Sequence, residues 1–93
     1  MEQLDERQPG APLAMSQIVD AALRALAVLK MNVSAVTSAV PDGDGWNVSV
    51  ELVERRGIPS TNDVLGVYEM RLDGAGNVVR YARTRMRRRC DFA

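Results

Sequence analysis

The spacing of apolar residues changes once along the chain, near residue 33. Between residues 13 and 31 apolar side chains recur every three or four positions, as in an amphipathic helix that buries one stripe. From residue 33 onward the period is two, which is typical of strands with one buried and one polar face. Ala and Leu, both strong helix formers, dominate the first segment. We therefore expect one helix followed by strands.

The apolar stripe of the predicted helix could cover a sheet, or it could bind a partner or a membrane surface. The polar face carries Gln17, Asp20 and Arg24, so it is not basic. Nothing else in the chain can cover a sheet, and we therefore favour that role. The helix residues expected in the core are Ile18, Ala22, Leu26 and Leu29.

Turn-forming residues divide the rest of the chain into four predicted strands. They gather at 41–45, 55–63 and 73–77, where Gly, Pro, Asn and Asp are frequent. Short connections favour pairing of consecutive strands. The predicted fold is α+β: an N-terminal amphipathic helix packed on a four-stranded antiparallel β-meander. The strand residues expected to face the helix are Trp46, Val48, Val50, Leu52, Tyr68, Met70 and Leu72.

The opposite face of the predicted sheet is charged. It would place Glu51 and Glu69 on the middle strands near Arg83 and Arg85 on the last one, as a cross-strand ladder of opposite charges. Leu65 and Val67 interrupt the alternation of the third strand. They are interpreted as facing a partner rather than water.

A chain of 93 residues is expected to form one domain. Residues 1–12 are polar and contain Pro9, Gly10 and Pro12, so they predict a disordered leader. A single α+β domain is predicted over residues 13–89, with a short C-terminal tail over residues 90–93. No apolar run is long enough to span a membrane, and no secretory signal is visible. We expect a soluble intracellular protein.

Residue types needed for common chemistry are scarce. The chain has no His, which removes the commonest general base and metal ligand. Its one cysteine, Cys90, cannot form an internal disulfide; it could link two chains, but an incidental thiol is favoured. The segment from Asp42 to Gly45 faintly resembles a calcium loop but lacks the later ligands, so we interpret it as a turn. The prediction is no enzyme, no cofactor and no metal.

Charge is balanced overall but unevenly placed. Residues 1–79 hold six basic and eleven acidic residues, a net of −5, whereas residues 80–93 hold six arginines and Asp91, a net of +5. The basic segment could bind RNA or another polyanion. Aromatic residues make up only 4% of the chain, which is poor for base stacking. We favour internal pairing plus docking onto a protein, and consider nucleic acid the weaker alternative.

One ordered set of motifs is shared with a known family. A Gly45-Trp46-x-Val-x-Val-Glu51-x-x-Glu54 strand precedes Ile58-Pro59-x-Thr61-x-Asp63-Val-Leu65, and Leu72-Asp73 and an Arg-rich final strand follow. This order resembles the gas vesicle protein O family. Gly66 departs from the Ala that this family usually has there.

The resemblance implies an accessory, non-shell protein of gas vesicle formation. Such a protein would be cytoplasmic and gas vesicle-associated. It would support assembly or its regulation through contacts with other gas vesicle proteins. A small RNA-binding or regulatory module is the alternative function.

The long connection after the second strand and the last-strand arginines form our predicted partner-binding surface, because long irregular loops often bind. The loop could equally be a wide connection shaped by Pro59 and Asp63. A homodimer is a further alternative, since a meander leaves edge strands open. The residues of the predicted surface are Ile58, Pro59, Thr61, Asp63, Arg83, Arg85, Arg87 and Arg88.

Overall fold

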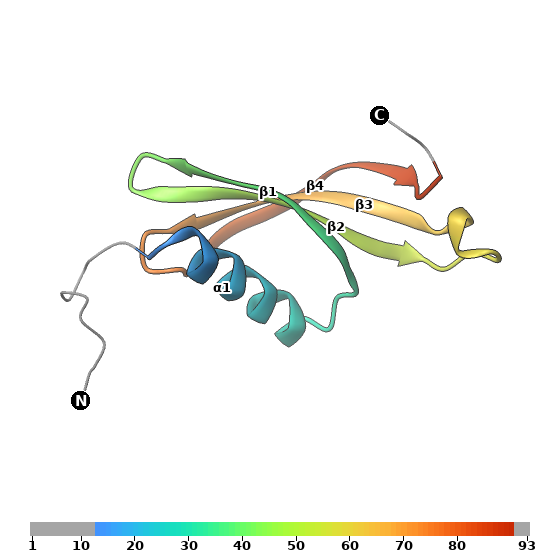
Figure 1. Cartoon of the computed structure of the whole chain (residues 1–93), viewed down its shortest axis with the longest axis horizontal. Coiled ribbons are helices and arrows are strands. Elements are labelled where there is room, and N and C mark those ends of the chain that lie inside the picture. The colour runs from blue at the N-terminus through green and yellow to red at the C-terminus, as the bar shows by residue number, and fades with distance from the viewer. Residues whose placement is uncertain (1–12, 91–93) are drawn as a thin grey trace.

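A computed structural model of the chain describes residues 13–90 and confirms the predicted α+β fold (Figure 1). The predicted leader over residues 1–12 and the last three tail residues lie outside the described part. The sheet is antiparallel with strand order β1-β2-β3-β4. No helix in the described part is long and apolar enough to cross a membrane. The elements are α1 (Met15–Val28), β1 (Val33–Asp42), β2 (Gly45–Arg55), the 3₁₀ helix η1 (Ser60–Asn62), β3 (Val64–Asp73) and β4 (Val78–Arg88).

The main core lies between α1 and one face of the sheet. Three residues of the helix stripe, Ile18, Ala22 and Leu26, are fully buried there. Burial of a large aliphatic side chain contributes about 1.5–3 kcal/mol, so this face holds the helix on the sheet. Trp46 and Tyr68 are only partly buried at the margin of this core. The buried sheet residues are Val48, Val50, Leu52, Met70 and Leu72.

The prediction that Leu29 belongs to the core is wrong, because 50% of its surface is exposed. The helix ends at Val28, one turn earlier than the apolar pattern indicates. The backbone then turns at Lys30, whose φ of 60° lies in the left-handed region. This turn brings Met31 rather than Leu29 against the core.

The start of α1 is attached to the β3–β4 turn. The Leu13 amide donates to the Gly74 carbonyl over 3.1 Å. Gly76, with φ at 91°, lies so close to the helix that a Cβ there would meet Leu13 and Ala21. The helix therefore covers the half of the sheet near this turn, whereas the β2–β3 loop and the end of β4 extend beyond it (Figure 1).

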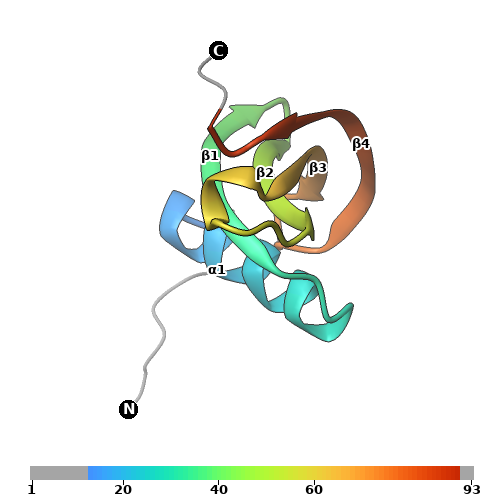
Figure 2. The same cartoon turned by 90° about the vertical axis from the view of Figure 1, so that its right-hand side faces the viewer.

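The end of β4 curls over the uncovered half of the sheet toward β1 (Figure 2). Arg89, just after β4, donates from Nη1 to Ser34 Oγ at the start of β1 over 3.1 Å. Leu65 and Val67, on the face away from α1, have exposed fractions of only 0% and 8%. The interpretation that these two residues face a partner is therefore wrong, because the chain itself covers them.

The register between β3 and β4 shifts at Thr84. Tyr68 pairs with Arg83, but the next residue, Val67, pairs with Arg85. The Thr84 hydroxyl donates to the Val67 carbonyl over 3.1 Å. Because one extra residue reverses the alternation, Arg83 lies on the helix-facing side of the sheet and Arg85 on the other. The expected ladder with both arginines on one face is therefore wrong.

Candidate interaction surface

The β2–β3 loop and the end of β4 meet at one end of the molecule. The Arg89 amide donates to the Asp63 carbonyl over 2.8 Å, and the Cys90 amide donates to the Thr61 carbonyl over 3.1 Å. These two bonds continue the β3–β4 pairing into the loop. The structure thus places the end of β4, just after Arg87 and Arg88, against the loop.

Asp63 holds this loop from the inside. Its carboxylate accepts a hydrogen bond from the Gly57 amide at 2.8 Å and two from the Arg89 guanidinium at 3.1 and 3.3 Å. The Gly57 N–H, followed by the Arg89 guanidinium, outweighs the effect of burial and keeps the pKa of Asp63 below its usual range. Only 1% of Asp63 is exposed. Its predicted place in the contact surface is therefore wrong, and its role there is to shape the loop.

Arg87 is also turned inward. Its guanidinium forms an ion pair with Glu51 on β2 at 3.0 Å, and only 21% of the Arg87 side chain is exposed. This pair lies on the face that buries Leu65 and Val67. Arg87 is therefore a poor candidate for direct contact with a partner.

Arg83 belongs to a cluster on the helix-facing side of the sheet. It lies 3.9 Å from Glu54, which also accepts a hydrogen bond from the Tyr68 hydroxyl at 2.6 Å. The ring of Tyr68 lies 6.1 Å from that of Tyr81. The bond to Glu54, aided by burial, raises the pKa of Tyr68 above its usual range. About half of the Arg83 side chain remains exposed.

The remaining predicted contact residues are exposed in the loop and along the last part of β4. Ile58 stands out because 97% of its surface is exposed, although it is a large aliphatic residue. Arg85 forms no ion pair with any residue in the described range, so its charge is not balanced locally. We define the loop-end surface as the exposed residues Ile58, Pro59, Thr61, Arg85 and Arg88.

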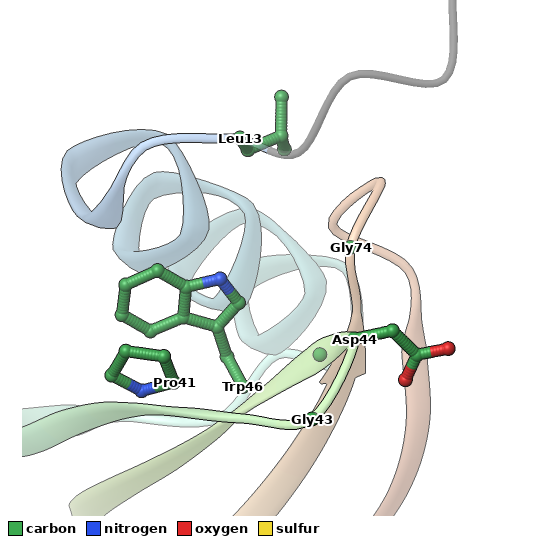
Figure 3. Close-up of a pocket in the computed structure, with 7 residues that line it drawn as sticks. Leu13, Pro41, Gly43, Asp44, Trp46 and Gly74 are labelled. Atoms are coloured by element: carbon green, nitrogen blue, oxygen red, sulfur yellow. The ribbon is translucent and has the colours of Figure 1, made fainter.

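A second candidate is a pocket of about 420 Å³ at the opposite end (Figure 3). Figure 3 shows the Trp46 indole beside Pro41, with Leu13 across the opening. Among the described residues that line it, the only charged one is Asp44, which is fully exposed and lies 3.6 Å from Arg71. The pocket thus offers apolar contact but no converging polar groups, and we regard it as the weaker candidate.

The most informative residue of the loop end was not predicted from the sequence. Arg89 joins β1, the loop and β4, yet it stands in a run with Arg87 and Arg88 from which no sequence pattern distinguishes it. Glu54 was likewise not expected beside Tyr68. Within residues 13–90 no group of three or more potential ligands could hold a metal ion.

The described residues form a small α+β domain with one helix, a curled four-stranded sheet and a basic loop end. The sequence pattern of the gas vesicle synthesis protein GvpO family matches residues 1–93, the whole chain. The chain belongs to this family, as its motifs predicted.

Three curated relatives carry the same family name. The chain is 47% identical to gas vesicle protein O of Haloferax mediterranei over 51 residues, which is 55% of this chain and 36% of that protein. It is 38% identical to gas vesicle protein O1 of Halobacterium salinarum over 65 residues, covering 70% of this chain and 55% of the relative. For gas vesicle protein O of a Streptomyces species the identity is 33% over 84 residues, covering 89% and 63%.

In each case the chain spans less than two thirds of the relative's length. No solved structure matches the chain.

Proposed function

We propose that this chain is an accessory protein of gas vesicle formation that binds another gas vesicle protein through the loop-end surface. Family membership supports the process. The observation that carries the surface is Ile58, an aliphatic side chain with 97% exposure on a loop that the buried Asp63–Arg89 pair holds in place. An exposed apolar residue on an ordered loop costs little entropy to bind, which is the property of an interface anchor.

The charge around Ile58 indicates the kind of partner. Arg85 and Arg88 are exposed on the neighbouring strand, and Arg55 and Arg56 are exposed where the loop begins. Basic residues around an apolar anchor favour a partner with an apolar pocket rimmed by carboxylates. The proposed partner surface is therefore acidic.

An RNA-binding role receives less support from the geometry. Much of the basic segment is neutralised within the chain: Arg83 lies near Glu54, Arg87 pairs with Glu51, and Arg89 pairs with Asp63. A surface for RNA would leave such arginines available to phosphates. RNA binding that weakens with added salt and is as tight as the binding of a gas vesicle protein would nevertheless favour the RNA-binding function over the proposed function.

Capture experiments with individual gas vesicle proteins test the surface. We expect Ile58→Ser and the double variant Arg85→Ala/Arg88→Ala to capture less partner than the unaltered chain. Val40→Ser is the matched control for Ile58, because Val40 is also exposed (53%) but lies on β1, outside the loop-end surface. Arg24→Ala, on the exposed side of α1, is the matched control for the arginines.

The expected result is reduced capture by the loop-end variants and unchanged capture by both controls. When the variants are supplied to cells that lack the native gene, vesicle formation should be reduced with the loop-end variants and unchanged with the two controls. Undiminished capture by folded Ile58→Ser and Arg85→Ala/Arg88→Ala variants would overturn the proposed surface. Normal vesicle formation without the gene would overturn the proposed process.

A further inference from the structure

The free edge of β4 presents backbone groups that β3 does not use. β4 is an outer strand of the sheet. In an antiparallel pair, residues alternate between exchanging hydrogen bonds with the partner strand and pointing their N–H and C=O groups away from it. The Asp73 amide bonds to Asn77 before β4, and the Arg89 amide bonds to Asp63 after it. These two bonds fix the phase of the alternation at both ends.

With that phase and the observed register, the outward-pointing residues of β4 are Val78, Tyr81, Arg83, Met86 and Arg88. The Arg88 carbonyl already accepts a hydrogen bond from Arg87 Nη1, and Val78 is the first residue of the strand. The central three, Tyr81, Arg83 and Met86, lie opposite Met70, Tyr68 and Gly66. β4 contains one extra residue at each of its two register shifts. These extra residues do not alter the assignment, because counting from either end of β4 gives the same outward-pointing residues. The edge thus offers N–H donors and C=O acceptors to an added strand.

The side chains along this edge differ between the two faces. On the helix-facing side Tyr81 and Met86 are apolar and exposed by 41% and 48%, and Arg83 lies between them, beside Glu54. On the other side Arg80 and Arg85 are exposed and form no ion pair with any residue of the described range. On the helix-facing side an added strand would meet two apolar neighbours and Arg83, whose charge is balanced by Glu54; on the other side it would meet the positive charge of Arg80 and Arg85.

A second copy of β4 does not fit this edge. The strand contains five arginines and no acidic residue, so two copies side by side would place like charges together, which is destabilising. The other edge, β1, is less suited to any strand. Pro41 has no amide donor, and Arg89 already hydrogen-bonds to the Ser34 hydroxyl at its start.

We propose that the free edge of β4 binds an extended segment of another protein in which acidic and apolar residues alternate. The acidic side chains lie beside Arg80 and Arg85, and the apolar ones lie beside Tyr81 and Met86. The backbone supplies affinity through strand addition, and the alternating side chains supply specificity. The identity of this segment as part of a gas vesicle protein rests on the proposed function. The binding of a strand at this edge rests on the geometry alone.

Amide hydrogen exchange with a short peptide of alternating Val and Glu tests the edge directly. A peptide of alternating Val and Lys is the control. We expect the Glu peptide to slow exchange at Tyr81, Arg83 and Met86 by about tenfold or more at saturation, because their amides become hydrogen-bonded. The Lys peptide should leave them unchanged. Equal protection by both peptides, or none by the Glu peptide, would overturn the proposal.

Met86→Pro removes an outward amide without removing a bond to β3, whereas Met86→Ala keeps the amide and shortens the side chain. Capture of the peptide or of a gas vesicle protein should fall at least about tenfold in Met86→Pro and much less in Met86→Ala. Equal losses in both would indicate side-chain contact and refute strand addition. If Met86→Pro fails to fold, the exchange measurement decides.

The two proposals can fail separately. Capture of a gas vesicle protein that leaves the three amides unprotected would refute the edge and retain the proposed function. Protection by the Glu peptide without capture of any gas vesicle protein would retain the edge and refute the proposed function.

Discussion

The guanidinium of Arg87 on β4 reaches across β3 to the carboxylate of Glu51 on β2. Its Nε and Nη2 atoms each lie 3.0 Å from one Glu51 oxygen, so the pair is bidentate. Both side chains are largely shielded, with exposed fractions of 21% and 13%. Shielding strengthens an ion pair only if its geometry is good, and this pair meets that condition.

We expect a double-mutant cycle of Glu51→Gln and Arg87→Ala to give a coupling free energy of about 1–2 kcal/mol. The matched control is the Asp20–Arg24 pair, whose side chains are 62% and 74% exposed. That exposed helix pair should give no more than about 0.5 kcal/mol. Urea unfolding of the single and double variants measures both values. Equal coupling in the two pairs would contradict the role assigned to shielding.

Two leucines of α1 should respond differently to truncation. Leu26 is fully buried, so Leu26→Ala should lower the free energy of unfolding by about 2–5 kcal/mol through lost burial and a cavity. Leu29 is half exposed at the end of the helix, and Leu29→Ala should cost less than about 1 kcal/mol. Thermal or urea unfolding distinguishes them. A large loss for Leu29→Ala would instead support the core position that the periodicity predicted.

Gly66 allows the Glu54–Tyr68 hydrogen bond to form. A Cβ at residue 66 would overlap the Glu54 carboxylate, which can move because it ends a flexible side chain. Gly66→Ala should therefore displace Glu54 and lower the pKa of Tyr68 toward its ordinary value, since that bond is the main cause of the raised pKa. Spectroscopic titration of tyrosinate measures the change, with Tyr81→Phe to isolate Tyr68. An unchanged Tyr68 titration would show that another group raises its pKa.

Asp63 should make the protein sensitive to acid. Its pKa is below the ordinary 3.8 in the folded state, chiefly because of the Gly57 amide. The stability it contributes is therefore complete above that ordinary pKa and is lost as the pH falls from there through the folded-state pKa. Asp63→Asn should be less stable at neutral pH, because Arg89 loses its carboxylate partner. Its free energy of unfolding should fall less on acidification than that of the unaltered chain. Asp73, whose pKa is also lowered, remains in both proteins.

The measurement is urea unfolding of both proteins at neutral pH and at a pH below the ordinary pKa of Asp. The difference between the two conditions should be smaller in Asp63→Asn than in the unaltered chain. An equal difference would assign the acid sensitivity to Asp73 and other carboxylates.

The sequence predicts the elements well because each residue's environment is set locally by the helix or strand it occupies. Val48 and Val50 alternate with polar residues and are buried where the pattern indicates. Leu29 is misplaced because the helix stops at a left-handed residue, Lys30, without the glycine that usually marks such an end. No rule of periodicity can detect that stop.

The interaction surface is less predictable, because it depends on contacts between distant residues. The extra residue at Thr84 moves Arg83 to the other face, and a strict period of two gives no sign of it. Asp63 looks like an exposed loop residue until Arg89, 26 positions later, covers it. Ile58 is exposed on a loop that the buried Asp63 fixes in place. This difference between the two loop residues is visible only in the folded chain.

The contact between Arg89 and Ser34 has a consequence for synthesis. These residues are 55 positions apart, and Arg89 also completes the site of Asp63. A growing chain can pair β1 with β2 and then β3 with β2 as each hairpin emerges. The half of the sheet beyond the helix, however, cannot close until Arg89 has left the ribosome, so loop closure comes last. Until then Leu65 and Val67 remain exposed to solvent, and it is in that interval that the nascent protein is most prone to aggregation.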